Sequence, residues 1–180
     1  KPVKTMDDLK GVKIRSHGTS AKVVKALGGT PVAMPMPELY QALQKGVVEA
    51  TMQSSSMMIM FKLNEVADYV TRGYLIPASL VIAVNMDTFR KMPGDIQDIL
   101  VETGKQQQEE THDFFINMAE KNTKTLRDMG MEVINLPKEE RDKWAEILQP
   151  YRDSLFESMG PEFSAKVKEI AAEVNAKYPY

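Results

Sequence analysis

The fold is decided by residues 11–34, which read GVKIRSHGTSAKVVKALGGTPVAM. Residues 12–16 predict a short strand, residues 19–27 a helix with one apolar side, and residues 30–34 a second strand. The Gly28-Gly29 pair falls where glycine commonly ends a helix. A strand, a helix and a strand in so short a stretch predict a right-handed βαβ unit and therefore a parallel sheet.

Arg15 ends the first predicted strand and is the leading candidate for a ligand-binding residue. Ligands of open parallel α/β sheets bind at the carboxyl ends of the strands. A guanidinium group there presents a rigid, permanently charged fork that matches a carboxylate with two parallel hydrogen bonds. The sequence therefore predicts a binding site for a small organic acid. His17, in the next loop, either adds a donor to an anionic ligand or only helps to cap the helix.

The composition excludes several classes of protein. With 180 residues, 43% of them hydrophobic and 27% charged, the chain is typical of an ordinary soluble globular protein. A net charge of −2 with both signs interspersed argues against a nucleic-acid partner. No apolar run approaches the roughly 18 residues of a membrane span. Cysteine is absent, which excludes disulfides, thiolate metal sites and cysteine nucleophiles.

No motif in the sequence indicates a cofactor, a metal or a catalytic centre. The glycine-rich nucleotide loops, the HExxH zinc motif and the GxSxG nucleophile motif are all absent. The two histidines, His17 and His112, are far apart in the sequence and make a weak case for zinc. We therefore expect no catalytic residue, no bound metal and no cofactor.

The rest of the chain continues the alternation of strands and helices and then becomes mainly helical. The expected elements are a helix over 38–45, a strand over 47–53, a short methionine-rich helix over 57–63, extended segments over 66–74 and 80–84, a long helix over 95–129, a strand over 131–136, and helices over 138–151 and 161–176. Residues 104–113 are polar on nearly every side, as in a helix that bridges two domains, and Gly104 is a plausible bend. We divide the chain into a ligand-binding α/β lobe (1–80), a crossover segment with the long bridging helix and a strand (81–136), and C-terminal helices (137–180).

Four stretches, in this order, resemble one known family. They are DLKGVKIR at 8–15, ALGGTPVAMPM at 26–36, ELYQALQKGVVE at 38–49 and MPGDIQ at 92–97. Together they resemble the second half of the solute-binding protein of a tripartite ATP-independent periplasmic (TRAP) transporter. The first stretch is similar to the family's DLKGLKIR, and the third to its EVYxALQxGxVDG.

The resemblance implies a fold and a function. The fold is α/β: a periplasmic-binding-protein-like lobe with a parallel or mixed sheet, helices on both faces, a long bridging helix and C-terminal helices. The family's first lobe would precede Lys1 and is then largely missing from these 180 residues. The implied function is that of a periplasmic solute-binding subunit, not an enzyme, which binds a small organic acid, such as a dicarboxylate, and works with TRAP membrane subunits.

The resemblance also implies roles for individual residues. Arg15 would form the salt bridge to the ligand carboxylate. Gln53 aligns with the asparagine of the family's DGQENP motif, in a stretch where this sequence departs from that motif. Met36 replaces an aromatic residue that is frequent in the family, so we expect an apolar but softer pocket wall. His17 and Tyr74 are weaker candidates for ligand contacts.

Two other functions stay open at this point. The chain could be a truncated or swapped fragment that assembles without binding a ligand, with apolar surface from about residue 80 onward covered by a homo-oligomer. A small hydrolase using Ser16, His17 and either Glu38 or Glu49 is less favoured, because adjacent side chains on an extended segment point apart. The identity of the acid also stays open, although the methionine-rich wall favours a ligand with an apolar part.

Overall fold

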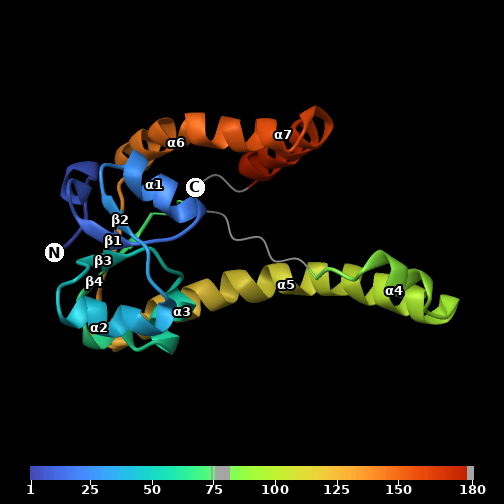
Figure 1. The fold of residues 1–180 in the computed structure, drawn as a ribbon, viewed down its shortest axis with the longest axis horizontal. Coiled ribbons are helices and arrows are strands. Elements are labelled where there is room, and N and C mark those ends of the chain that lie inside the picture. The colour runs from blue at the N-terminus through green and yellow to red at the C-terminus, as the bar shows by residue number, and fades with distance from the viewer. Residues whose placement is uncertain (74, 76–81, 178–180) are drawn as a thin grey trace.

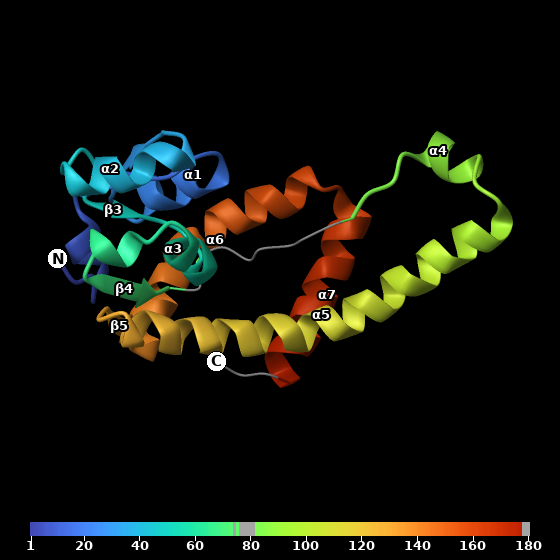
Figure 2. The same ribbon diagram turned by 90° about the horizontal axis from the view of Figure 1, so that it is seen from below.

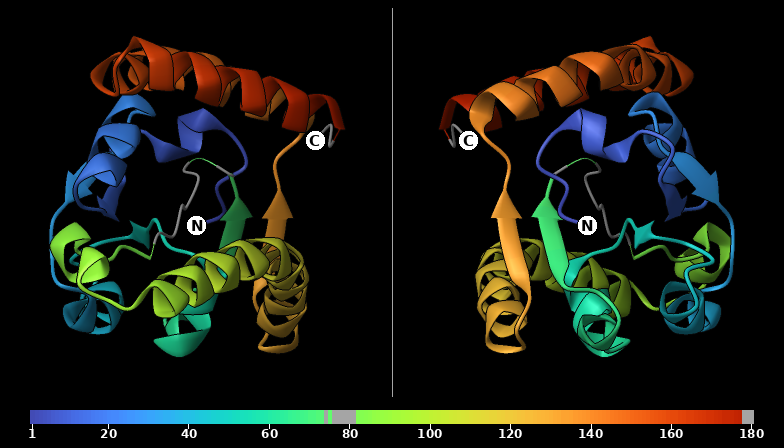
Figure 3. Two further views of the ribbon diagram at one scale, coloured as in Figure 1. Left: turned by 90° about the vertical axis from the view of Figure 1, so that its right-hand side faces the viewer. Right: turned by 90° about the vertical axis from the view of Figure 1, so that its left-hand side faces the viewer.

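The computed structural model describes residues 1–73, 75 and 82–177 (Figure 1). These residues form two parallel sheets. The first sheet has the strand order β2-β1-β3, with β1 at Lys13–Arg15, β2 at Thr30–Val32 and β3 at Ala50–Thr51. The second sheet pairs β4 (Tyr69–Arg72) with β5 (Glu132–Asn135). Figure 3 shows these two strands side by side and pointing the same way.

The helices connect and cover these strands. In chain order they are η1 (Met6–Leu9), α1 (Thr19–Ala26), η2 (Met36–Glu38), α2 (Leu39–Gln44), α3 (Ser55–Met60), η3 (Leu63–Glu65), α4 (Met86–Arg90), α5 (Gly94–Asp128), α6 (Lys138–Ser158) and α7 (Pro161–Lys177). Because α1 joins β1 to β2, and η2 with α2 joins β2 to β3, both connections are the crossovers that parallel strands require.

Two apolar cores lie against the two faces of the first sheet. One joins Ile14 of β1 to α1 and to Trp144 and Leu148 of α6. The other joins Leu39 of α2 to residues of α3, η3 and α5, with Val32 of β2 packed against it. Ile14 and Val32 lie on opposite faces because side chains alternate along a strand. The predicted α/β fold with helices on both faces is confirmed, and every described strand pair is parallel.

Some elements differ in length from the sequence prediction. The third strand is shorter than 47–53, because the N–H groups of Val47 and Val48 bind the Ala42 carbonyl and close α2 instead (2.9 and 3.3 Å). Helix α6 continues past residue 151 to Ser158, through Pro150. Helix α5 is unbroken through Gly104, where a bend was predicted.

Helix α5 is anchored to the α/β body near its C-terminal end. Near its C-terminal end Leu126 is 1% exposed, and Asn122 Nδ2 donates to Ser56 Oγ of α3 at 2.9 Å. From there the helix extends away from the α/β body toward α4 (Figures 1 and 2). Its outer part and α4 expose large apolar side chains, namely Met86, Ile96, Ile99, Leu100, Val101, Phe114 and Phe115. Such exposure matches the bare apolar surface that the sequence predicts for this region.

None of the described helices, α5 included, combines the length and the apolar character that a bilayer-spanning segment requires. The division of the chain into segments 1–80, 81–136 and 137–180 stays a prediction. Strand β4 of segment 1–80 pairs with strand β5 of segment 81–136, so these two segments share one sheet.

Glu140 ties the N-terminal segment to α6. Its carboxylate accepts hydrogen bonds from the Met6 backbone N–H (2.7 Å), from Trp144 Nε1 (3.0 Å) and from Lys143 Nζ (3.3 Å). Because these donors favour the charged form, with the Met6 N–H the strongest, they lower the pKa of Glu140 below its ordinary value of 4.5.

A Glu140→Gln variant should therefore lose stability in a pH-dependent way. A carboxylate with a lowered pKa stabilises the fold fully above its unfolded pKa, and this contribution disappears as the pH falls through the folded pKa. Melting temperatures of the wild type and the variant should differ most above pH 4.5 and converge in more acidic solution. Glu139→Gln, one residue away and exposed, is the matched control and should show no such trend. A Glu140→Gln deficit that is constant from pH 3 to pH 7 would contradict the assignment.

Candidate functional site

Arg15 lies at the carboxyl end of β1 and is 5% exposed. Its Nε and Nη2 atoms both donate to the Met34 carbonyl oxygen, at 3.2 and 3.1 Å. Among the described residues no carboxylate lies within ion-pair distance of this guanidinium. The charge is therefore buried against a neutral carbonyl just past the end of β2.

The Met34 contact decides how an anion can reach Arg15. A guanidinium has five N–H donors in a fixed fork, and the carbonyl occupies the side formed by Nε and Nη2. The donors of Nη1 and the second proton of Nη2 remain at the end of the fork. A carboxylate can therefore bind end-on, with its two oxygens facing Nη1 and Nη2.

Thr51 is a polar neighbour of Arg15 that the sequence interpretation missed. It pairs with Arg15 in the register of β1 and β3, so the two side chains share one face of the sheet. Thr51 Oγ1 is buried and has no hydrogen-bond partner among the described residues. A buried hydroxyl without a hydrogen-bond partner costs free energy. Thr51 Oγ1 is therefore a polar atom beside Arg15 whose hydrogen-bonding capacity no described residue satisfies. The strand order that brings Thr51 beside Arg15 cannot be read from local sequence patterns.

Gln53 and Met36 meet at the same edge of the first sheet. Gln53 follows β3 and Met36 opens η2 after β2, and Gln53 Nε2 donates to Met36 Sδ at 3.4 Å. Both side chains are half-buried. The structure thus brings Met36 and Gln53 together next to the strand that ends in Arg15.

His17 and Tyr74 are placed less firmly. His17 is exposed, and the described hydrogen bonds of this residue come from its backbone: its N–H donates to Ser20 Oγ (3.0 Å), and Ser20 Oγ donates to its carbonyl (2.7 Å). This local turn runs into the start of α1. A ligand contact by the imidazole stays a prediction. Tyr74 lies outside the described residues.

Two residues of the hydrolase alternative, Ser16 and Glu49, make hydrogen bonds to the backbone of β1. Ser16 is 1% exposed and its Oγ donates to the Ile14 carbonyl at 3.3 Å. Glu49 accepts from the Lys13 backbone N–H at 3.1 Å. Neither contact joins a nucleophile to a base, so the described geometry does not support acyl transfer here. In the described part of the chain, no three His, Asp or Glu side chains form a group that could hold a metal ion.

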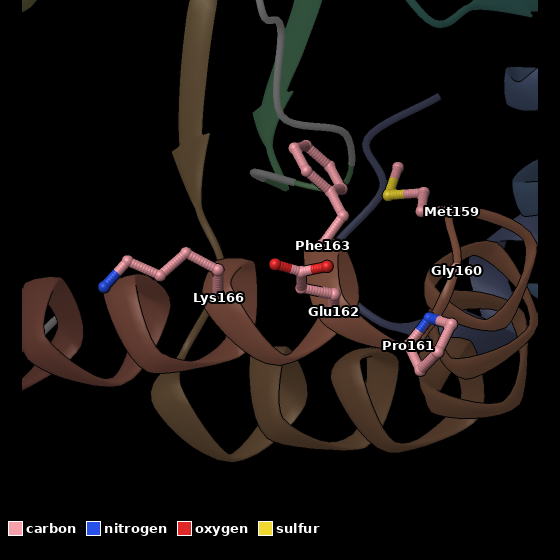
Figure 4. Close-up of a pocket in the computed structure, with 6 residues that line it drawn as sticks. All are labelled: Met159, Gly160, Pro161, Glu162, Phe163 and Lys166. Carbon is pink, nitrogen blue, oxygen red and sulfur yellow. The ribbon is translucent and has the colours of Figure 1, made fainter.

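A surface hollow lies where α6 turns into α7, far from strand β1 (Figures 1 and 4). It measures about 650 Å³ and is open to solvent. Its lining residues are Met159, Gly160, Pro161, Glu162, Phe163 and Lys166. Lys166 already pairs with Glu169 at 3.0 Å, and both side chains are largely exposed. The hollow therefore has no buried, unpaired charge like the guanidinium of Arg15.

Comparison with known sequences places the chain in a family. Residues 1–159 match the family described as bacterial extracellular solute-binding protein, family 7 (DctP). The chain belongs to this family. Among family-7 relatives, the C4-dicarboxylate-binding periplasmic protein DctP of Rhodobacter capsulatus is 34% identical over 180 residues, which cover 96% of this chain and 53% of that protein.

Solved structures of TRAP periplasmic solute-binding proteins support the same placement. A TRAP periplasmic solute-binding protein from Desulfovibrio salexigens superimposes with a TM-score of 0.81 at 26% identity, over 99% of this chain and 57% of that one. A second, from Bordetella bronchiseptica with bound (R)- and (S)-mandelate, gives a TM-score of 0.70 at 26% identity, over 88% and 51%. The chain thus spans about half the length of the relatives it matches.

Family membership confirms several predictions. Family 7 consists of periplasmic solute-binding proteins, which are transport components and not enzymes. The predicted resemblance to TRAP solute-binding proteins, the periplasmic location and the non-enzymatic character are therefore confirmed. The roles of individual site residues stay predictions.

Proposed function

We propose that this chain supplies the carboxylate-binding wall of a solute site, and that Arg15 forms the ion pair with a small organic acid. The main support is the buried guanidinium, which has no acidic partner among the described residues and has free donors at the end of its fork. An isolated buried charge is costly, and a ligand carboxylate would compensate it.

The surrounding residues suit this role. Gln53 and Thr51 add polar groups next to Arg15, and Met36 adds an apolar, adaptable wall. We propose His17 as a further ligand contact at the rim of the same site, and Tyr74 stays a predicted contact outside the described residues. Relatives support a carboxylate ligand: one is named for C4-dicarboxylates, one holds mandelate, and the Desulfovibrio protein holds the C-terminus of a symmetry mate in its ligand-binding site.

We propose that the bound acid is then delivered to TRAP membrane subunits in the periplasm. In that role the site must close over its ligand, because desolvation strengthens the ion pair that holds the acid.

The test of acid binding is a titration of the chain with acids and with their neutral amides. Succinate and mandelate are compared with succinamide and mandelamide by NMR, which detects millimolar dissociation constants. We expect shifts in the resonances of Met36 and Gln53 with the acids, and none with the amides. Amides that bind as well as the acids would contradict the ion pair.

Association into a homo-oligomer is a subordinate proposal. The exposed apolar side chains of α4 and outer α5 support it, because large exposed apolar patches favour association. Sedimentation velocity over a concentration series should then show dimers or larger species. A strict monomer at the highest concentration would contradict this proposal and leave acid binding untouched.

A further inference from the structure

The contact that holds Arg15 comes from the short segment between β2 and η2. Strand β2 ends at Val32, and Met34 and Pro35 lead from there into η2. The Met34 carbonyl oxygen accepts from Arg15 Nε at 3.2 Å and from Arg15 Nη2 at 3.1 Å. This oxygen belongs to the planar peptide bond between Met34 and Pro35, so the backbone torsions of these two residues decide where it points.

Pro35 restricts both of these residues. Its ring fixes its own φ near −65°, and the structure has φ −59° and ψ 149° at this position. The ring also disfavours the helical conformation for the preceding residue, Met34, and so favours an extended backbone there. Alanine at position 35 would leave both residues free to adopt other conformations.

The segment is also held at both ends by backbone hydrogen bonds. On the strand side, the Val32 carbonyl accepts from a backbone N–H that follows β1, at 3.1 Å. On the helix side, the Pro35 carbonyl accepts from the Glu38 N–H at 3.2 Å. The Met34 carbonyl is therefore fixed in the free chain, and Arg15 is ordered by it before any ligand binds.

Resting on the acid binding proposed above, we propose that Pro35 is a positioning residue for Arg15. By fixing the Met34 carbonyl, it holds the guanidinium with the end of its fork free for a carboxylate. An arginine side chain has high rotamer entropy, and ordering such a side chain on binding weakens the complex. Loss of the order that Pro35 supplies corresponds to roughly three- to tenfold in affinity.

The Nε proton of Arg15 measures this order without any ligand. Because it donates to the Met34 carbonyl, it should exchange slowly with water in the free wild-type chain. NMR detects this proton, and its absence in Arg15→Met assigns it. In Pro35→Ala its exchange rate should rise by about tenfold or more.

Pro37→Ala is the matched control. Pro37 is exposed like Pro35, and its replacement makes the same chemical change within η2. Its ring restricts Met36 and leaves the Met34 peptide unaffected. Pro37→Ala should therefore keep the wild-type exchange rate at Arg15.

Acid binding is the second readout. In NMR titrations, succinate should bind Pro35→Ala roughly three- to tenfold more weakly than the wild type. Its dissociation constant for Pro37→Ala should stay within about twofold of the wild-type value.

The outcomes separate the positioning role from the proposed function. An unprotected Arg15 Nε proton in the wild type would overturn the positioning role, and this measurement does not depend on how well Pro35→Ala folds. Equal protection in Pro35→Ala, or an unchanged dissociation constant for succinate, would also overturn it. Failure of both succinate and mandelate to bind the wild type would overturn the proposed function, and the positioning role with it.

Discussion

Replacing Arg15 with methionine should weaken acid binding by roughly 30-fold or more while leaving the free chain about as stable as the wild type. Truncating one partner of a buried charge pair typically costs about 2–5 kcal/mol of binding free energy. In the free chain two effects oppose each other. The variant removes a buried cation that has no acidic partner among the described residues, and it leaves the Met34 carbonyl without its two donors.

Lys13→Met is the matched control for this prediction. Lys13 lies on the same strand and the same face as Arg15 but is exposed. The Lys13→Met variant removes one positive charge, as Arg15→Met does. Because the Lys13 charge is exposed to solvent, its removal should change the dissociation constant less than about twofold. Equal weakening by both variants would indicate a general charge effect. Unfolding of Arg15→Met would show that Arg15 is needed for the fold.

Truncating Leu126 should have the largest effect on stability among the substitutions considered. Leu126 is 1% exposed and joins α5 to the core formed with Leu39 and Leu63. A Leu→Ala change in such a core costs about 2–5 kcal/mol, because transfer energy is lost and a cavity is left. We expect Leu126→Ala to lower the free energy of unfolding by that amount in urea denaturation.

Leu100→Ala, on the same helix, is the control for Leu126→Ala. Leu100 is 41% exposed on outer α5, so its truncation should change the free energy of unfolding by about 0.5 kcal/mol or less. Similar losses for the two variants would mean that outer α5 is also packed in solution, which would favour the homo-oligomer.

Local sequence patterns predict the βαβ unit that carries Arg15. The glycine pair after α1, the apolar residues of α1 and the strand residues around Ile14 all favour the same structure, and the structure has it. Gly28 has φ +89°, a conformation that glycine adopts easily, so the end of α1 is readable from sequence. The end of α6 was not readable, because Pro150 normally favours a helix boundary.

The details of the site depend on contacts that sequence spacing does not encode. The Met34 carbonyl occupies one side of the Arg15 fork through a backbone atom, which any residue type supplies. Thr51 becomes a neighbour of Arg15 only through the strand order β2-β1-β3. The contact between Gln53 and Met36 joins residues that follow two different strands, β3 and β2. Tertiary packing decides all three, so local propensity could not predict them.

A crystal structure of the chain with a bound acid tests the central claim most directly. The expected complex has the two carboxylate oxygens within hydrogen-bond distance of Arg15 Nη1 and Nη2, while Nε still donates to the Met34 carbonyl. An acid bound away from Arg15, or on the side of the guanidinium now occupied by Met34, would contradict it.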